Sequence, residues 1–351
     1  MGNRVTLNTI AEAVGVSRTT VSNAYNRPDQ LAPELRDRIL GTARRLGYSG
    51  PDPAARRLRS GRRDAVGLLV TEGLSYTFTD PASVLLLQGI ARATEDAGLA
   101  LLVVPARGGV EDAVVDAFCL YSVPVGHPNV EAVQERGVPL VVVDEPRLPG
   151  HAFVGVEDRR GASLAAEHLL ALGHRRFALL ADPTRLDGYA GPLTPEREAS
   201  AMSATFVERL GGYRDALGRW GVDWASTPRF ELPANTPERG LEGGRMALAA
   251  EPRTTALIAA TDQLALGAIE AAREAGLRVP EDLSIVGFDD VPGAAWSQPG
   301  LTTVRQPLFH KGELAGRLLA AGAGPREVIL PVELVVRGST APPADRPAGS
   351  P

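Results

Sequence analysis

Cysteine and lysine each occur only once in the 351 residues, and long apolar runs do not occur at all. A single thiol, Cys119, excludes a disulfide framework and any zinc or iron–sulfur site built on several thiolates. No apolar run approaches the roughly 20 residues that a membrane-spanning helix needs. The N-terminus also lacks the long uncharged stretch of a secretory signal. We therefore expect a soluble, cytoplasmic protein with no membrane partner.

The motifs of common enzyme classes are also missing from the sequence. There is no HExxH, G-x-S-x-G or P-loop pattern, and no GxGxxG follows the apolar run Ala65–Val70. The histidines fall in no metal-ligand spacing; they are His127, His151, His168, His174 and His310. We therefore predict that the protein is not an enzyme and has no catalytic residues, no metal and no cofactor.

The formal net charge of −5 is unevenly distributed along the chain. Residues 1–63 carry a charge of +7 and the remaining residues a charge of −12. A basic head on an acidic body is typical of a nucleic-acid-binding segment joined to a domain with a separate role. Charge alone does not decide this, because many basic segments are merely solvated.

The first 50 residues carry a pattern of three short helices. Thr6 can cap the first helix, Gly15 allows a tight turn after it, and Ser17 can cap the second. Pro33 opens a third helix, which Gly47 closes. This order describes a helix-turn-helix unit, with a small ligand-free helical bundle as the alternative. The second helix favours the former, because its outward face offers the short hydrogen-bonding groups that a helix in the major groove requires.

Several stretches of the chain resemble the LacI/GalR family of bacterial transcriptional regulators. They are VTLNTIAEAVGVSRTTVSNAYN, PELRDRILGTARRLGY, PAARRLRSGRRDAVGLLV, FVGVEDRRGASLAAEHLLALGHRRFALL, TALIAATDQLALGAIEAAREAGLRVPEDLSIVGFDDVP and LTTVRQP. They cover nearly the whole chain in the order expected of that family. The resemblance implies an N-terminal all-α helix-turn-helix domain and an α/β body of two doubly wound parallel-sheet lobes, like those of periplasmic binding proteins.

The resemblance also implies a double-stranded DNA operator as partner. In the family a hinge helix lies in the minor groove and a leucine wedges a base step open; Leu58 matches that leucine, and Ala55 matches the small residue facing the groove floor. A flexible arginine-rich linker is the alternative, and this hinge is one residue longer than the usual pattern. The predicted DNA-binding residues are Thr6, Ser17, Arg18, Thr19, Thr20, Ser22, Asn23, Asn26, Ala55 and Leu58.

From Ala65 onward, β-rich runs alternate with helical stretches, which predicts parallel sheets of the doubly wound type. We expect a helix-turn-helix domain at 1–50, a hinge at 51–64, an effector-binding and dimerisation domain at 65–340 and a disordered tail at 341–351. The family has three crossings between lobes, which we place near Glu157, Val291 and Gly322. Lobe one then comprises about 65–157 and 291–322, and lobe two about 158–290 and 323–340. The expected strands are Ala65–Val70, Leu99–Val104, Leu140–Val143, Phe177–Leu180, Ala256–Ala259 and Ser284–Gly287.

The resemblance places a small-molecule effector between the lobes, at the carboxyl ends of the strands. Acids, an arginine and aromatic rings around one cleft suit a polyhydroxylated, sugar-like ligand. For Asp144 and Asp289 a structural role in capping loops is the alternative. The predicted effector-binding residues are Tyr76, Phe78, Asp80, Asp144, Arg209, Asn235, Asp262 and Asp289.

Two segments depart from the family pattern: 106–113 is short where a second crossover helix is usual, and 181–203 is a long Gly/Pro/Thr-rich loop. That loop is a candidate effector lid. The Pro-rich C-terminus has no leucine heptad, so we expect a homodimer and, by symmetry, a pseudo-palindromic operator. We therefore predict a ligand-controlled repressor. The alternative of a solute-binding protein would explain the α/β body but not the basic helix-turn-helix head. The alternative of a Rossmann-type enzyme would need a set of catalytic residues, and the sequence shows none.

Overall fold

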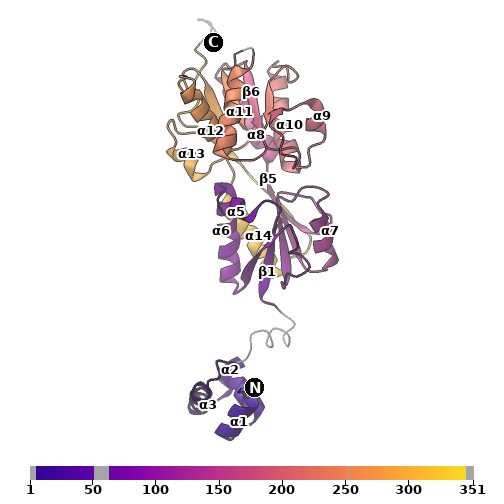
Figure 1. The fold of residues 1–351 in the computed structure, drawn as a ribbon, viewed down its shortest axis with the longest axis vertical. Helices are drawn as coiled ribbons and strands as arrows, with labels where there is room; N and C mark the ends of the chain where they lie inside the picture. Colours follow the sequence, from indigo (N-terminus) through magenta and orange to yellow (C-terminus); the bar gives the residue numbers. More distant parts are fainter. Residues whose placement is uncertain (1–4, 51–62, 252, 345–351) are drawn as a thin grey trace. The chain divides into compact units, whose positions relative to one another are not determined.

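The computed structural model describes residues 5–50, 63–251 and 253–344, and the chain divides into two compact units, residues 1–64 and 65–351 (Figure 1). The predicted hinge residues Ala55 and Leu58 lie outside the described residues, as does most of the predicted tail. No helix in the described ranges is both long enough and apolar enough to cross a membrane.

The first unit is built from short helices, of which the first two begin at side-chain caps. Thr6 accepts a hydrogen bond from the backbone N–H of Thr9, and Gly15 ends the first helix with a φ of 77°, a left-handed conformation that glycine adopts without strain. Ser17 Oγ accepts from the Thr20 N–H at 3.0 Å. The elements are α1 (Leu7–Val14), α2 (Arg18–Asn26), η1 (Pro28–Gln30) and α3 (Pro33–Arg45).

A small apolar core holds these helices together. Val21 and Ala24 of α2 are buried against Ile10 of α1 and against Ile39 and Ala43 of α3. Val21 and Ala24 lie three positions apart, so they share one face of α2 and leave the opposite face in solvent. The helix-turn-helix arrangement predicted from the sequence is therefore present.

The second unit alternates strands and helices. Its helices are α5 (Leu74–Thr77), α6 (Pro81–Asp96), α7 (Pro128–Glu135), α8 (Asp158–Ala171), α9 (Pro195–Ala199), α10 (Ala204–Arg219), α11 (Pro237–Ala249), α12 (Asp262–Glu274), α13 (Pro292–Trp296) and α14 (Leu308–Ala321). Its strands are β1 (Ala65–Val70), β2 (Ala100–Pro105), β3 (Ala117–Tyr121), β4 (Leu140–Val143), β5 (Ala152–Val156), β6 (Phe177–Ala181), β7 (Gly191–Pro192), β8 (Arg229–Glu231), β9 (Ala256–Ala259), β10 (Ser284–Asp289), β11 (Thr302–Arg305), β12 (Glu327–Leu330) and β13 (Glu333–Val335).

These strands form two sheets, one in each lobe. Among the described residues, the lobe-one sheet has the order β12-β5-β4-β3-β1-β2 and is parallel throughout. The lobe-two sheet has the order β13-β11-β10-β9-β6-β8-β7, and only its edge strands β13 and β7 pair antiparallel with their neighbours. This arrangement confirms the predicted fold class of two doubly wound lobes.

The chain crosses between the lobes at positions that differ from two of the three predicted ones. The first crossing joins β5 to α8 and passes through Glu157, as expected. The second does not occur near Val291, because β11 still pairs with β10 in lobe two. The third does not occur near Gly322, because β12 pairs with β5 in lobe one. The crossings instead follow β11 and β12, and the strand pairing that fixes them is not visible in local sequence.

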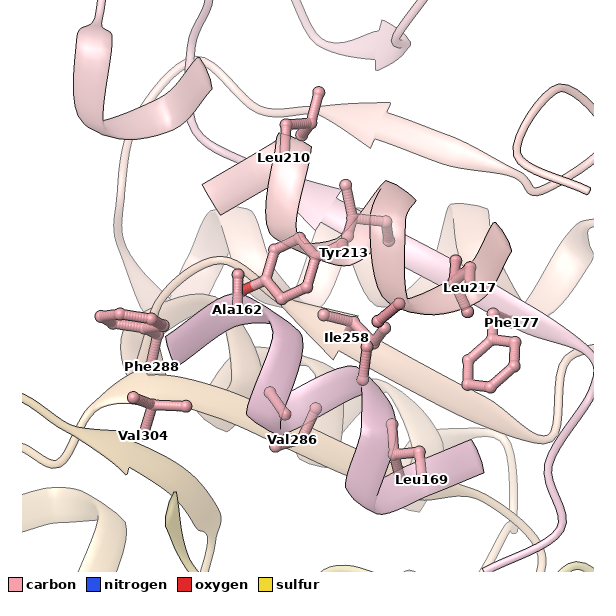
Figure 2. Packing of buried hydrophobic residues seen from close by; sticks show 14 of the residues in the cluster. Ala162, Leu169, Phe177, Leu210, Tyr213, Leu217, Ile258, Val286, Phe288 and Val304 are labelled. Atoms are coloured by element: carbon pink, nitrogen blue, oxygen red, sulfur yellow. The ribbon is translucent and has the colours of Figure 1, made fainter. Parts of the chain in front are cut away.

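The core of lobe two lies beneath α8 and α10. Figure 2 shows Leu210, Tyr213 and Leu217 of α10 packed with Ala162 and Leu169 of α8 over strand residues of the sheet. This packing fixes the start of α10, which carries Arg209 toward the junction of the lobes.

The two segments that depart from the family pattern differ in structure. Between β2 and β3 the chain makes turns and no helix, as the short 106–113 stretch predicts. The 181–203 segment is more ordered than the predicted loop, because it contains β7 and α9. It is tied to β8 through Glu231, whose carboxylate accepts from the Thr184 N–H at 2.6 Å and from Arg197 Nε at 2.6 Å.

Candidate functional site: the polar face of α2 and the cavity between the lobes

The exposed face of α2 is polar and carries no acidic residue. Arg18, Thr19 and Asn26 are exposed, and Ser22 and Asn23 are half-buried. Thr19, Ser22, Asn23 and Asn26 lie one, four, five and eight positions after Arg18. This spacing puts all five residues on the side of the helix opposite Val21 and Ala24. A helix with this face can hydrogen-bond to base edges without repelling phosphates.

The predicted DNA-binding residues divide by what their side chains already contact. Thr6 and Ser17 are helix caps, and Thr20 lies 2.8 Å from Ser17, Oγ1 to Oγ. Asn26 Nδ2 donates to the Ser22 carbonyl at 3.0 Å. The side chains of Arg18, Thr19 and Asn23 make no hydrogen bond within the described residues, so they are available to bind a partner.

A cavity of about 480 Å³ lies between the two lobes. Its walls come from the carboxyl ends of β1, β3, β4, β6 and β10, from the starts of α6 and α10, and from α14. Dipoles and side chains converge at such strand ends, which is where open parallel sheets bind ligands. A larger hollow of about 680 Å³ lies beside α8 and α10, but its charges pair with one another, as Arg159 does with Asp215 at 2.6 Å.

A series of polar contacts in the cavity wall connects lobe one to lobe two. Lys311 Nζ, on α14, donates to both Asp144 oxygens and to Gln306 Oε1, each at 2.8 Å. Gln306 Nε2 in turn donates to Asp289 Oδ1 at 2.6 Å. Asp289 Oδ1 lies 3.7 Å from Arg209 Nη1. Each step joins groups of opposite polarity, so the two lobes share one electrostatic network.

Arg209 is the cation at the lobe-two end of this network. Its Nε donates to Asp158 Oδ1 at 2.8 Å, its Nη1 donates to the Ala260 carbonyl at 3.0 Å, and its guanidinium lies 3.8 Å from the centre of the Phe288 ring. Burial acts to lower the pKa of Arg209, but Asp158 and Asp289 outweigh burial and raise it. Arg209 therefore stays charged and holds a fixed orientation toward the cavity.

Backbone strain is concentrated at the cavity wall. Ser122, Asp144 and Asp289 have φ values of 46°, 68° and 121°, in the region that favours glycine. Each lies at the end of a strand and lines the cavity. Such conformations cost on the order of 1–3 kcal/mol each and gather at ligand-binding sites.

Some buried polar atoms in the wall have no hydrogen-bond partner among the described residues. They are Asp80 Oδ1, Asp182 Oδ1 and the Tyr213 hydroxyl. Asp80 Oδ2, by contrast, accepts from the Ser83 N–H at 2.8 Å and caps α6. An unmet buried acceptor costs roughly 1–3 kcal/mol, so these atoms point to a ligand that donates hydrogen bonds.

Comparison with known proteins agrees with both units. Residues 6–50 match the model of bacterial regulatory proteins of the lacI family, and residues 166–340 match the periplasmic binding protein-like domain. An HTH-type transcriptional regulator of Mycobacterium tuberculosis is 42% identical over 356 residues, which span 97% of this chain and 98% of that one. The chain belongs to the LacI family.

Solved LacI-family structures share the whole architecture. A complex of the transcriptional regulator CelR with cellobiose is 30% identical, with a TM-score of 0.68 over 96% of this chain and 100% of that one. The lac repressor dimer bound to operator and the anti-inducer ONPF is 27% identical, with a TM-score of 0.77 over 97% of this chain and 100% of that one. This LacI-family chain is therefore a DNA-binding transcriptional regulator and not an enzyme.

Six of the eight predicted effector-binding residues of the regulator line the cavity. Phe78 does not line it and is 56% exposed. Asp262 does not either: its buried carboxylate accepts from the Val291 N–H at 2.9 Å and from the Thr303 hydroxyl. It ties the start of α12 to the segment after β10 and to β11, so the prediction of a place in the cavity for Asp262 is wrong. The lining residues are Tyr76, Asp80, Asp144, Arg209, Asn235 and Asp289.

Sequence reasoning missed several residues of this site. Asp182 directly follows β6 and could have been found by the rule that strand ends meet at one edge. Lys311 is the only lysine of the sequence and is 1% exposed, which no local pattern indicates. Gln306 and Asp158 join the network only through tertiary contacts.

Glu145 connects the lobes directly. It follows β4 of lobe one, and its Oε2 accepts hydrogen bonds from the Ala204 and Thr205 N–H groups at the start of α10 in lobe two, the latter at 3.3 Å. Burial raises the pKa of Glu145 to about 7; the hydrogen bonds from Ala204, Thr205 and Ser203 oppose this rise and the charge of Asp144 adds to it. Glu145 thus caps the helix that carries Arg209.

We expect Glu145→Gln to stabilise the regulator at alkaline pH. In the folded state Glu145 has a pKa of about 7 and its ordinary value is 4.5, so the folded state binds more protons between those values and loses stability as pH rises through them. Glutamine removes this loss and still accepts one backbone hydrogen bond. Urea unfolding between about pH 5 and pH 8 should show the variant gaining about 1–3 kcal/mol on its parent over that range.

The exposed Glu135 at the end of α7 supplies the control. The unfolding free energy of Glu135→Gln should have the same pH profile as that of the parent. Parallel pH profiles for the parent and Glu145→Gln would show that Glu145 does not titrate in this range.

Proposed function

We propose that the regulator is a repressor that binds a pseudo-palindromic operator as a homodimer and responds to a sugar-like ligand in the cavity between its lobes. The unmet buried acceptors Asp80 Oδ1 and Asp182 Oδ1 carry the proposal, because they come from different lobes and face one cavity. A ligand that donates to both stabilises one arrangement of the lobes over others. The ligand can shift DNA affinity only by the difference between its binding free energies for the alternative lobe arrangements, usually about 1–3 kcal/mol.

The neighbours support this ligand class. One solved relative is a complex with cellobiose, and a LacI-family regulator from Enterococcus faecium, 27% identical, contains bound ribose. The aromatic rings of Tyr76, Tyr121 and Phe206 in the wall suit the apolar faces of sugar rings. The 181–203 segment supplies Asp182, Pro183 and Leu186 to the wall, and we propose that it contributes to ligand selection.

The proposal is tested by screening and by DNA binding. Thermal unfolding with a panel of sugars identifies ligands, because a bound ligand raises the melting temperature by mass action. A DNA fragment selected by the protein from a random pool then supplies the operator, whose symmetry is read directly. A selected sequence without twofold symmetry would contradict the dimeric mode of binding.

We expect Arg18→Ala to reduce the preference for the operator over random DNA by about 1–3 kcal/mol. Arg18 is exposed at the start of α2, and an arginine pairs bidentately with guanine. Anisotropy titrations with both DNAs measure the ratio of affinities. Arg36 is an exposed arginine on α3, so Arg36→Ala removes the same charge. This control should weaken binding to both DNAs equally. An unchanged ratio for Arg18→Ala would remove Arg18 from base recognition.

A further inference from the structure

The cavity has more acidic than basic residues. Of the described residues that line it, six are acidic and two are basic: Glu72, Asp80, Asp144, Glu145, Asp182 and Asp289 against Arg209 and Lys311. Both cations are already engaged, Lys311 with Asp144 at 2.8 Å and Arg209 with Asp158 at 2.8 Å. The cavity therefore has more carboxyl groups than its own cations can pair with.

Three of these acids, Glu72, Asp80 and Asp182, influence one another: burial raises the pKa of Glu72 to about 7, and the charges of Asp80 and Asp182 add to the rise. None of the three forms an ion pair within the described residues. Asp80 is 6% exposed and has Oδ1 without a partner, and Asp182 likewise has a buried Oδ1 without one. Burial raises the pKa of Asp182 to about 6, Arg209 opposing the rise and Asp80 adding to it. The carboxylates of the two lobes thus repel one another across the cavity.

A positively charged group in the ligand removes this repulsion, whereas a neutral hydroxyl only supplies a hydrogen bond. Opposite charge within a partly desolvated site is worth more than a neutral contact. A metal ion does not fit, because no group of three or more acidic, histidine or cysteine side chains among the described residues has the geometry to hold one. An ammonium group, with three donors, suits two carboxylate oxygens that have no hydrogen-bond partner.

We propose that the effector is an amine-bearing polyol, whose protonated amine lies between Asp80 and Asp182 while its hydroxyls meet Arg209 and Asn235, which line the same cavity. This inference rests on the proposed function, because it takes the cavity to be the effector site. It assigns specificity to Asp80 and Asp182, which select an amine over a hydroxyl and reject phosphate and carboxylate groups.

Matched pairs of small molecules test the inference on the full-length protein. Thermal unfolding is measured with glucosamine against glucose, galactosamine against galactose, and Tris against pentaerythritol, with glucose 6-phosphate as the anionic probe. We expect each amine to bind at least roughly tenfold more tightly than its neutral counterpart and the phosphate not to bind. Asp182→Asn should abolish the preference, and so should Asp80→Asn, which keeps a residue that caps α6 equally well.

Asp96→Asn provides the matched control, because Asp96 lies on the same helix α6 with its side chain 60% exposed. It should keep the full amine preference. Equal or tighter binding of the neutral partners overturns the inference, and so does an absence of stabilisation by all three amines.

DNA binding separates this inference from the proposed function. If a neutral sugar binds and alters operator affinity, the proposed function stands and the amine inference fails. If the amines bind through Asp80 and Asp182 but leave operator affinity unchanged, the ligand class stands and the regulatory role of the cavity fails.

Discussion

Arg209→Ala should lower the free energy of unfolding of residues 65–351 by about 3–5 kcal/mol, the usual effect of removing one partner of a buried ion pair. Without the guanidinium, the buried carboxylates of Asp158 and Asp289 lose their nearest cation, at 2.8 Å and 3.7 Å. The Ala260 carbonyl and the face of Phe288 lose a contact as well. The three tryptophans, Trp220, Trp224 and Trp296, all belong to this unit, so their fluorescence in urea reports its unfolding.

A surface pair gives the comparison for Arg209. Arg159 of α8 pairs with Asp215 at 2.6 Å, but the two side chains are 47% and 39% exposed. Arg159→Ala should therefore cost no more than about 1 kcal/mol. If the two variants lose similar amounts of unfolding free energy, the polar network in the cavity wall contributes no more to stability than a surface ion pair.

Arg209→Ala should also abolish the response to effector, because the arginine faces the cavity. DNA binding without effector is measured in parallel, so that a lost response is distinguished from lost DNA binding. A full response in the variant would place the effector site away from Arg209.

Gly89→Ala should destabilise the same unit by about 3 kcal/mol or more, at the upper end of the range for overpacking. Helices α6 and α14 are in such close contact at this point that an added Cβ would lie 2.0 Å from the Phe309 carbonyl oxygen and 2.6 Å from the Glu313 nitrogen. Both neighbours are backbone atoms, so no side chain can rotate away. The helices must separate, which displaces Asp80 and Lys311 at the cavity.

Gly218, in the last turn of α10, is the matched control. A Cβ there would meet nothing within 4 Å, so Gly218→Ala should stabilise the helix by up to about 1 kcal/mol. Urea unfolding followed by fluorescence compares the two variants. A neutral Gly89→Ala would show that α6 and α14 are less closely packed than this structure has them.

Much of the fold was predictable because several of its central strands are continuous apolar runs. β1, β4 and β9 have the predicted bounds, since each is a fully buried run of apolar residues. The lobe crossings were not predictable, because β11 and β12 join their sheets through partners far away in sequence. Local patterns indicate that a strand forms but not which sheet it joins.

The site was predictable to the extent that strand ends meet at one edge. Asp144 and Asp289 follow from that rule, and both line the cavity. Asp262 also follows a strand, but its side chain turns toward Val291 and Thr303, a choice made by tertiary hydrogen bonds. Lys311 comes from a helix 167 residues away from Asp144, so sequence alone gives no sign of their contact.

The central claim is that a ligand in the cavity between the lobes controls binding of DNA by the helix-turn-helix unit. The most direct test is an anisotropy titration of the selected operator fragment, with and without a saturating concentration of the ligand found by thermal screening. The account predicts a change in operator affinity of roughly 5- to 150-fold, with no comparable change for a random sequence and no response in Arg209→Ala. A ligand that saturates the cavity yet leaves operator affinity unchanged would contradict it.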